Sequence, residues 1–209
     1  ANKLIVRHFK ASNYQSSAWD ISAELAHANK LVYGDINLST FTKQAGQLLA
    51  PLQSFSSPLP IHYDQALAAE LNWRLTNPNL KTSRASRLKS NFTLGKMTGD
   101  FSFYAASRDF NLLSKQANAS LKVEGLAKDV FSLIGASPPK EGLEKAVLNI
   151  GLVGADNISA NILADLKTQN DIFKAAGNLR DAGLERQLQG KLDFKLSDLS
   201  DYFIGDGDP

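Results

Sequence analysis

The sequence contains no cysteine, one methionine and three histidines. Without cysteine the chain cannot form a disulfide framework, carry thiol chemistry or build a cysteine-ligated zinc site. His8, His27 and His62 do not share a metal-binding spacing, so we interpret them as ordinary surface or half-buried side chains. The residues therefore predict neither a metal site nor a cofactor.

Long hydrophobic runs are also absent. No run of about 18 apolar residues occurs, so this stretch predicts no membrane-spanning helix, and it shows no secretory signal. Strand-like residues begin at Lys3, and the chain ends in the glycine- and aspartate-rich residues 205–209. We expect both ends to be boundaries within a longer exported protein, with any signal or membrane anchor outside this stretch.

Signatures of catalysis are missing too. The chain has no Gly-x-Ser-x-Gly elbow, no phosphate-binding glycine loop and no dinucleotide fingerprint. Asp198 and Asp201 are typical of a solvated helix face, and Asp206 and Asp208 lack the further oxygen ligands that calcium requires. We predict that the chain is not an enzyme and has no catalytic residue.

Neither sign of charge is in large excess, because the chain has 23 basic and 21 acidic residues and a formal net charge of +2. This balance does not favour nucleic acid as a partner. One local basic cluster stands out, formed by Lys81, Arg84, Arg87 and Lys89. It is either a solvated loop or edge strand protected by charge, or a set of contacts to lipid headgroup phosphates.

What the sequence does contain is alternation of apolar and polar residues. Leu71, Trp73 and Leu75 alternate with Asn72 and Arg74, for example. The same pattern recurs in residues 19–27, 92–94, 101–103, 121–123, 158–166, 173–179 and 188–196. A period of two with one polar face is typical of antiparallel sheets. The predicted fold class is mainly β: curved antiparallel meanders with a few short helices, arranged as an open, groove-like sheet or as a sandwich with a filled core.

Breaks in the alternation predict turns and helices. Turn residues predict connections at 29–30, 33–35, 96–100 and 181–183, and Gly99, Gly177 and Gly190 predict turns or bulges. Three segments each predict a short helix that follows a strand and ends near a proline: 39–49, 126–135 and 197–205. This recurrence indicates a weak internal repeat, or only a common way for antiparallel hairpins to end.

The segment 53–60 combines serine and proline and is the best linker candidate. It would separate an N-terminal strand–strand–helix unit, residues 1–52, from a C-terminal meander region, residues 60–209. The alternative is a loop inside one continuous sheet.

The apolar faces of the predicted strands are the candidate binding surface. Burial of each methylene contributes about 0.8 kcal/mol, so a groove for an acyl chain needs continuity and no special residue type. The candidates for such a groove are Leu71, Trp73, Leu75, Phe92, Leu94, Phe101, Phe103, Leu121, Val123, Ile162, Leu192 and Phe194. The same residues could instead fill the core of a sandwich.

Three features together resemble the C-terminal part of the AsmA-like proteins of Gram-negative bacteria. They are a strand that runs into a short helix at 119–135, a hairpin at 145–166, and a strand rich in glycine, leucine and aspartate at 189–203. The resemblance covers roughly two thirds of the chain, from about residue 60 to 203, and residues 1–59 match it less clearly.

The resemblance implies an inner-membrane anchor followed by a periplasmic part built of repeated meanders. That part would hold or conduct phospholipid, or another acyl-chain ligand, along a hydrophobic groove between the inner and outer membranes and so affect outer-membrane assembly. We therefore expect this chain to be a periplasmic segment of such a protein. The alternative is a non-catalytic envelope scaffolding module with a filled core and protein partners.

Overall fold

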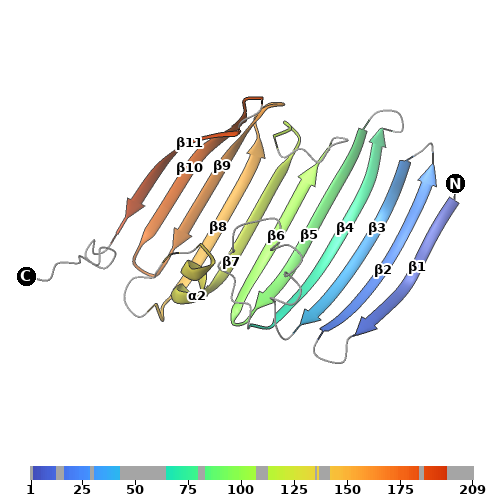
Figure 1. Ribbon diagram of the computed structural model, residues 1–209, viewed down its shortest axis with the longest axis horizontal. Helices are drawn as coiled ribbons and strands as arrows, with labels where there is room; N and C mark the ends of the chain where they lie inside the picture. Colours follow the sequence, from blue (N-terminus) through green and yellow to red (C-terminus); the bar gives the residue numbers. More distant parts are fainter. Residues whose placement is uncertain are drawn as a thin grey trace, which may run out of the picture.

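The computed structural model describes residues 2–12, 17–28, 31–42, 65–79, 83–106, 113–134, 136, 142–183 and 186–196. They form one open sheet of eleven strands, in which each strand pairs with the next one along the chain. Figure 1 shows β1 and β11 at the two opposite edges of this sheet. The predicted fold class, an open and mainly antiparallel β meander, is confirmed.

The strands are β1 (Asn2–Ser12), β2 (Ser17–Ala28), β3 (Leu31–Thr42), β4 (Leu67–Asn79), β5 (Ser83–Leu94), β6 (Met97–Ala105), β7 (Asn118–Leu126), β8 (Lys145–Gly154), β9 (Ser159–Lys167), β10 (Ile172–Asp181) and β11 (Arg186–Lys195). All ten strand pairs are antiparallel. This follows from the alternating sequence, because each strand can turn one face to solvent.

The sheet continues across the predicted linker. β3 pairs with β4 from Thr42 opposite Leu67 to Gly34 opposite Leu75. The linker candidate, residues 53–60, lies outside the described residues, but the strands on either side of it are neighbours in one sheet.

Of the predicted turns, the one at 33–35 is wrong, because these residues lie inside β3. Gly34 has a φ of +143°, and a Cβ there would approach the Glu24 carbonyl oxygen to 1.9 Å. The glycine therefore serves a close approach of β2 to β3 rather than a reversal of the chain. The turn predicted at 29–30 lies outside the described residues.

The other two turn predictions fare differently. At 96–100 the reversal is earlier than predicted: β5 ends at Leu94, Gly95 has a φ of +58°, and β6 begins at Met97. The turn at 181–183 is confirmed, with β10 ending at Asp181 and Gly183 at a φ of +89°.

The three glycines predicted as turns or bulges lie inside regular strand pairs, so that prediction is wrong. Gly99 pairs with Phe92, and Gly177 pairs with Gly190, without a shift of register. The register shifts instead between Val6 and Phe9 and between Thr76 and Asn79. The alternation of residues between the two faces continues through these glycines, and the residue that pairs with each glycine determines what the glycine does in the sheet.

One of the three predicted helices is confirmed as α2 (Ala127–Leu133), which follows β7. The helix predicted at 39–49 is wrong for residues 39–42, which extend β3 to Thr42. Residues 43–49 and the helix predicted at 197–205 lie outside the described residues. Figure 1 shows α2 in front of one end of β7 and β8.

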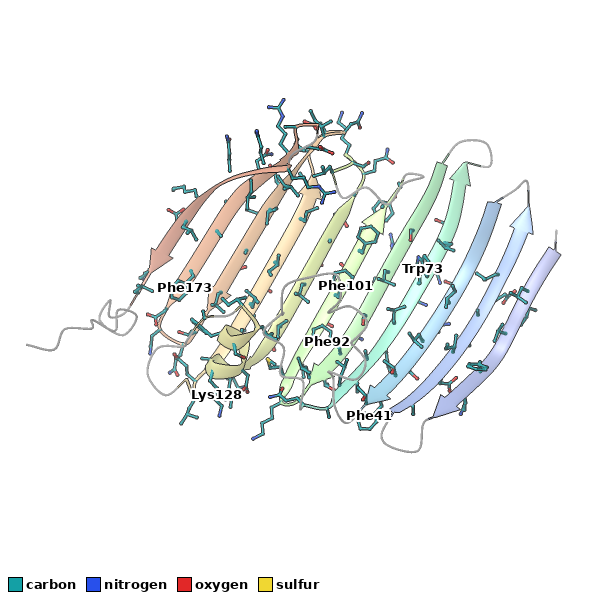
Figure 2. The ribbon with its side chains drawn as sticks, viewed as in Figure 1. Phe41, Trp73, Phe92, Phe101, Lys128 and Phe173 are labelled. Atoms are coloured by element: carbon teal, nitrogen blue, oxygen red, sulfur yellow. The ribbon has the colours of Figure 1, made fainter. Side chains whose placement is uncertain are left out.

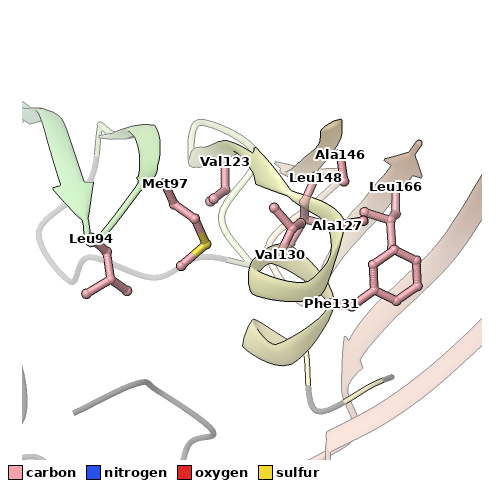
Figure 3. Packing of buried hydrophobic residues seen from close by; sticks show 9 residues of the cluster. All are labelled: Leu94, Met97, Val123, Ala127, Val130, Phe131, Ala146, Leu148 and Leu166. Atoms are coloured by element: carbon pink, nitrogen blue, oxygen red, sulfur yellow. The ribbon is translucent and has the colours of Figure 1, made fainter. Parts of the chain in front are cut away.

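The best-buried apolar cluster lies where α2 meets the sheet (Figure 3). Ala127 and Val130 of the helix are fully buried, and Met97 and Val123 lie beneath them on β6 and β7. Phe131 meets Phe173 of β10 edge to face, with ring centroids 6.1 Å apart. α2 therefore closes one end of the apolar face.

Replacement of Phe131 by alanine should lower the free energy of unfolding by about 3–5 kcal/mol, because it leaves a cavity between α2 and β10. Lys128→Ala, on the exposed side of the same helix, should change it by no more than about 0.5 kcal/mol. Urea unfolding measures both. Equal, small losses for the two variants would show that α2 does not pack as described.

Asp156 organises the turn between β8 and β9. Its carboxylate accepts hydrogen bonds from the Ile158 N–H and the Ser159 hydroxyl, both at 2.7 Å. The backbone donor at Ile158, followed by the Ser159 hydroxyl, lowers the pKa of Asp156 because both bonds favour its charged form.

This lowered pKa predicts a pH-dependent contribution to stability. The contribution is present above the unfolded-state pKa, about 3.9, and is lost as the pH falls through the lower folded-state pKa. Asp156→Ala should therefore be less stable than the parent at neutral pH, and the gap should close in acid below both values. A gap that stays constant over that range in urea titrations would refute this role.

Candidate functional site

The predicted groove residues whose side chains are described share one face of the sheet, and the side chain of Phe194 lies outside the described residues. Directly paired residues of neighbouring strands lie on the same face, as do residues two apart on one strand. The register links Trp73 to Leu88 and Leu88 to Phe103 in this way. Figure 2 shows Trp73, Phe92, Phe101 and Phe173 spread from β4 to β10.

We call this surface the apolar face. Its residues form rows that cross the sheet. One row runs from β3 to β9 through Ile36, Trp73, Leu88, Phe103, Ala119, Leu152 and Ile162. The next runs from β3 to β11 through Leu38, Leu71, Ser90, Phe101, Leu121, Ile150, Ala164, Ala175 and Leu192. At a strand spacing of about 4.8 Å, the eleven strands present an apolar face about 48 Å long.

Among the described residues, α2 is the only element that packs on this face. Trp73, Phe101 and Phe103 are accordingly only half-buried. Exposure rises at the two edges of the sheet, where Leu4 is 59% and Leu192 75% exposed. An apolar surface of this extent is typical of a binding surface rather than of an ordinary solvated face.

The indole of Trp73 is integrated into the apolar face. Its Nε1–H donates to the Ser86 hydroxyl at 2.7 Å, and Ser86 itself is buried on β5. The indole N–H therefore has its hydrogen bond within the face, and the ring presents hydrocarbon.

Near the centre of the apolar face, the Phe92 ring packs directly on Gly99 of the neighbouring strand. A Cβ on Gly99 would lie 2.3 Å from Cζ of Phe92, so the ring lies flat over the glycine. Aromatic residues commonly cover glycines in neighbouring strands in this way. Gly99, which was predicted as a turn or bulge, thus lies beneath an aromatic ring.

Polar cross-strand pairs predominate on the opposite surface, which we call the polar face, and the apolar Val153 and Leu163 are also exposed there. In the ion pairs, the side-chain nitrogen and the carboxylate oxygen lie 3.4 Å apart for Lys3 and Glu24, 3.5 Å for Lys10 and Asp20, and 2.7 Å for Arg74 and Asp35. The Asn72 amide donates a hydrogen bond of 2.6 Å to the Asn37 side-chain oxygen. Along β7, a hydrogen bond from Lys122 lowers the pKa of the Glu124 carboxyl. Opposite charges and matched amides set side by side help to hold the register of an antiparallel sheet.

The headgroup candidates are not on the apolar face. Arg87 and Lys89 project from the polar face, where the Arg87 guanidinium lies 5.9 Å from the centroid of the Tyr104 ring. Lys81 lies outside the described residues, and so does the side chain of Arg84. The sheet thus separates Arg87 and Lys89 from the groove candidates.

Several hollows lined by described residues lie on the polar face. One of these has a volume of about 770 Å³, and its lining includes the charged Lys10 and Glu70 together with the apolar Ala18, Phe41 and Ala68. A smaller one of about 330 Å³ includes Arg87, Lys89 and Asn118. Sequence reasoning missed these hollows, because alternation assigns residues to faces and carries no information on which face is indented.

Within the described ranges, no three His, Asp or Glu side chains come close enough together to hold a metal ion. None of the helices described is long and apolar enough to cross a membrane. No protein-family model, curated protein or solved structure matches the chain.

Adding a methyl group at Gly99 tests the packing of the apolar face. Gly99→Ala should lower the free energy of unfolding by about 1–3 kcal/mol because the added methyl group would displace the Phe92 ring. In a Phe92→Ala background the same change should be neutral or slightly stabilising, since alanine suits a strand better than glycine. Chemical denaturation of the four proteins closes this cycle. Equal costs in both backgrounds would show that the ring does not rest on Gly99.

Proposed function

We propose that the apolar face holds the acyl chains of phospholipid. In this proposal the chain is a periplasmic segment of an AsmA-like, inner-membrane-anchored protein that conducts phospholipid between the inner and outer membranes and so affects outer-membrane assembly. The observation that supports it is the set of largely apolar rows that cross the open sheet formed by the described strands.

The energetics favour a hydrocarbon occupant. Each methylene removed from water contributes about 0.8 kcal/mol, so an acyl chain gains from any continuous apolar track. Protein interfaces instead carry about one hydrogen bond per 100–200 Å². On the apolar face the rows contain few polar groups, and Ser86 is already bonded to Trp73.

The dimensions agree with this occupant. The hydrocarbon core of a bilayer is about 30 Å thick, so one leaflet's acyl chains span about 15 Å. The apolar face is about 48 Å long by strand spacing, so it has room for more than one acyl chain end to end. Such continuity is what movement along a surface requires, since a lipid would not have to expose its tails to water between sites.

A paired substitution tests the proposal on the 209-residue chain. Leu38 and Leu71 are directly paired on the apolar face, and Leu38→Lys with Leu71→Lys would place two ammonium groups in one row. The control adds the same charge to the polar face with Ser39→Lys and Asn91→Lys, which flank Glu70 in the register. Circular dichroism checks that both variants keep the sheet.

Native mass spectrometry and uptake of labelled phosphatidylcholine provide the measurements. The parent and the polar-face control should carry lipid, and the apolar-face variant should bind at least several-fold less. A parent chain that neither retains lipid nor takes it up would overturn the proposal in favour of the scaffolding module. Undiminished binding by a folded apolar-face variant would overturn the assignment of the face.

A further inference from the structure

The two edges of the sheet differ in how well they are protected from further pairing. At one edge, the register of β1 shifts between Val6 and Phe9, and a bulge of this kind discourages another strand from adding. At the other edge, β11 pairs with β10 over its whole length without a shift, from Asp181 opposite Arg186 to Ile172 opposite Lys195. β11 is thus a regular edge strand of ten residues.

The hydrogen-bonding direction of β11 follows from its neighbours. The Asp181 N–H donates to the Ile158 carbonyl at 2.7 Å, toward β9. Backbone groups alternate sides along an antiparallel strand, so Arg180 and every second residue before it on β10 bond to β11. The register then directs Gln189, Lys191 and Asp193 toward β10.

The alternate residues of β11 direct their backbone N–H and C=O groups to the outer edge, where none of the described strands pairs with them. These are Leu188, Gly190, Leu192 and Phe194, and the side chains of Leu188 and Leu192 belong to the apolar face. Leu188 is 65% exposed and Leu192 is 75% exposed. The edge therefore offers both backbone groups and apolar side chains to a further strand.

Charge also distinguishes this edge. On the edge strand β1, Lys3 and Lys10 form ion pairs with Glu24 and Asp20 of the neighbouring strand β2. On β11, Lys191 and Asp193 instead pair with each other along the edge strand, at 2.9 Å and with both side chains largely exposed. Both charges thus remain at the edge, spaced so that an antiparallel copy could match them.

We propose that β11 pairs with β11 of a second copy of this chain, antiparallel and about a two-fold axis at Leu192. In this register Leu192 lies opposite its own copy, and Gly190 lies opposite Phe194. Lys191 lies opposite Asp193 in both directions, in the pairs whose side chains approach most closely. An interface of this kind is isologous and closes after two copies.

Neighbouring registers are disfavoured by charge. Moving the axis to Lys191 would place that lysine opposite its own copy, and moving it to Asp193 would do the same for the two carboxylates. Like charges directly opposite each other destabilise a strand pair. The register centred on Leu192 also repeats a charge pairing that the sheet uses internally, where Arg74 lies opposite Asp35.

The two-fold axis is perpendicular to the sheet, so the apolar faces of both copies point the same way. The rows would then continue across the interface and double the length of the apolar face. The pairing itself stands independently of any ligand, because it rests on the edge strand alone.

Charge reversal tests the register. Lys191→Asp and Asp193→Lys each place like charges opposite each other, so each should weaken dimerisation at least about tenfold in analytical ultracentrifugation. An equimolar mixture of the two variants should dimerise again, because one strand then carries two acids and the other two lysines. The double reversal, Lys191→Asp with Asp193→Lys, should also restore the dimer.

The restored pairings separate the proposal from damage to the fold. Both side chains are largely exposed, and circular dichroism and thermal unfolding confirm that each variant keeps the sheet. A parent chain that sediments only as a monomer would overturn the proposal. So would a dimer that ignores both reversals, or one that the mixture fails to restore, because the interface would then lie elsewhere.

Discussion

The pairing of every strand with its neighbour in sequence is the constraint on which the rest of this structure depends. With all pairs antiparallel and nearly all in continuous register, a period-two sequence sorts most of its residues onto two faces, one largely apolar and one largely polar. Apolar rows arise on one face and cross-strand ion pairs and amide pairs on the other. A slip of one residue between two strands would move the apolar residues of one strand to the polar face, so the polar pairs help to specify the apolar face.

Sorting of this kind is why much of the candidate site could be predicted from the sequence. Trp73, Phe103 and Leu121 were assigned to a common surface from alternation alone, and the register places them there. The helix at α2 was predictable for a similar reason, because the period changes from two to that of a helix at Leu126. Face membership is a local property, and local periodicity reports it.

The remaining features depend on pairing partners that a single sequence does not reveal. Gly34 was predicted as a turn, yet it makes room for the Glu24 carbonyl of the adjacent strand. Gly99 was predicted as a bulge or turn and instead lies under the Phe92 ring. Arg87 and Lys89 flank Leu88, so alternation separates them from that residue, but only the register shows that Leu88 lies beside Trp73 and Phe103 on the apolar face. The positions of the hollows depend on how the strands twist and curve together.

The central claim is that hydrocarbon lies on the apolar face, and photocrosslinking tests it most directly. A phospholipid with a photoreactive group on its acyl chain would be bound to the chain and irradiated, and the labelled residues identified by mass spectrometry. The account predicts labels at Trp73, Phe101 and Leu121. Labels concentrated instead at Asn72, Ser102 and Ser120, their neighbours in sequence on the polar face, would contradict it.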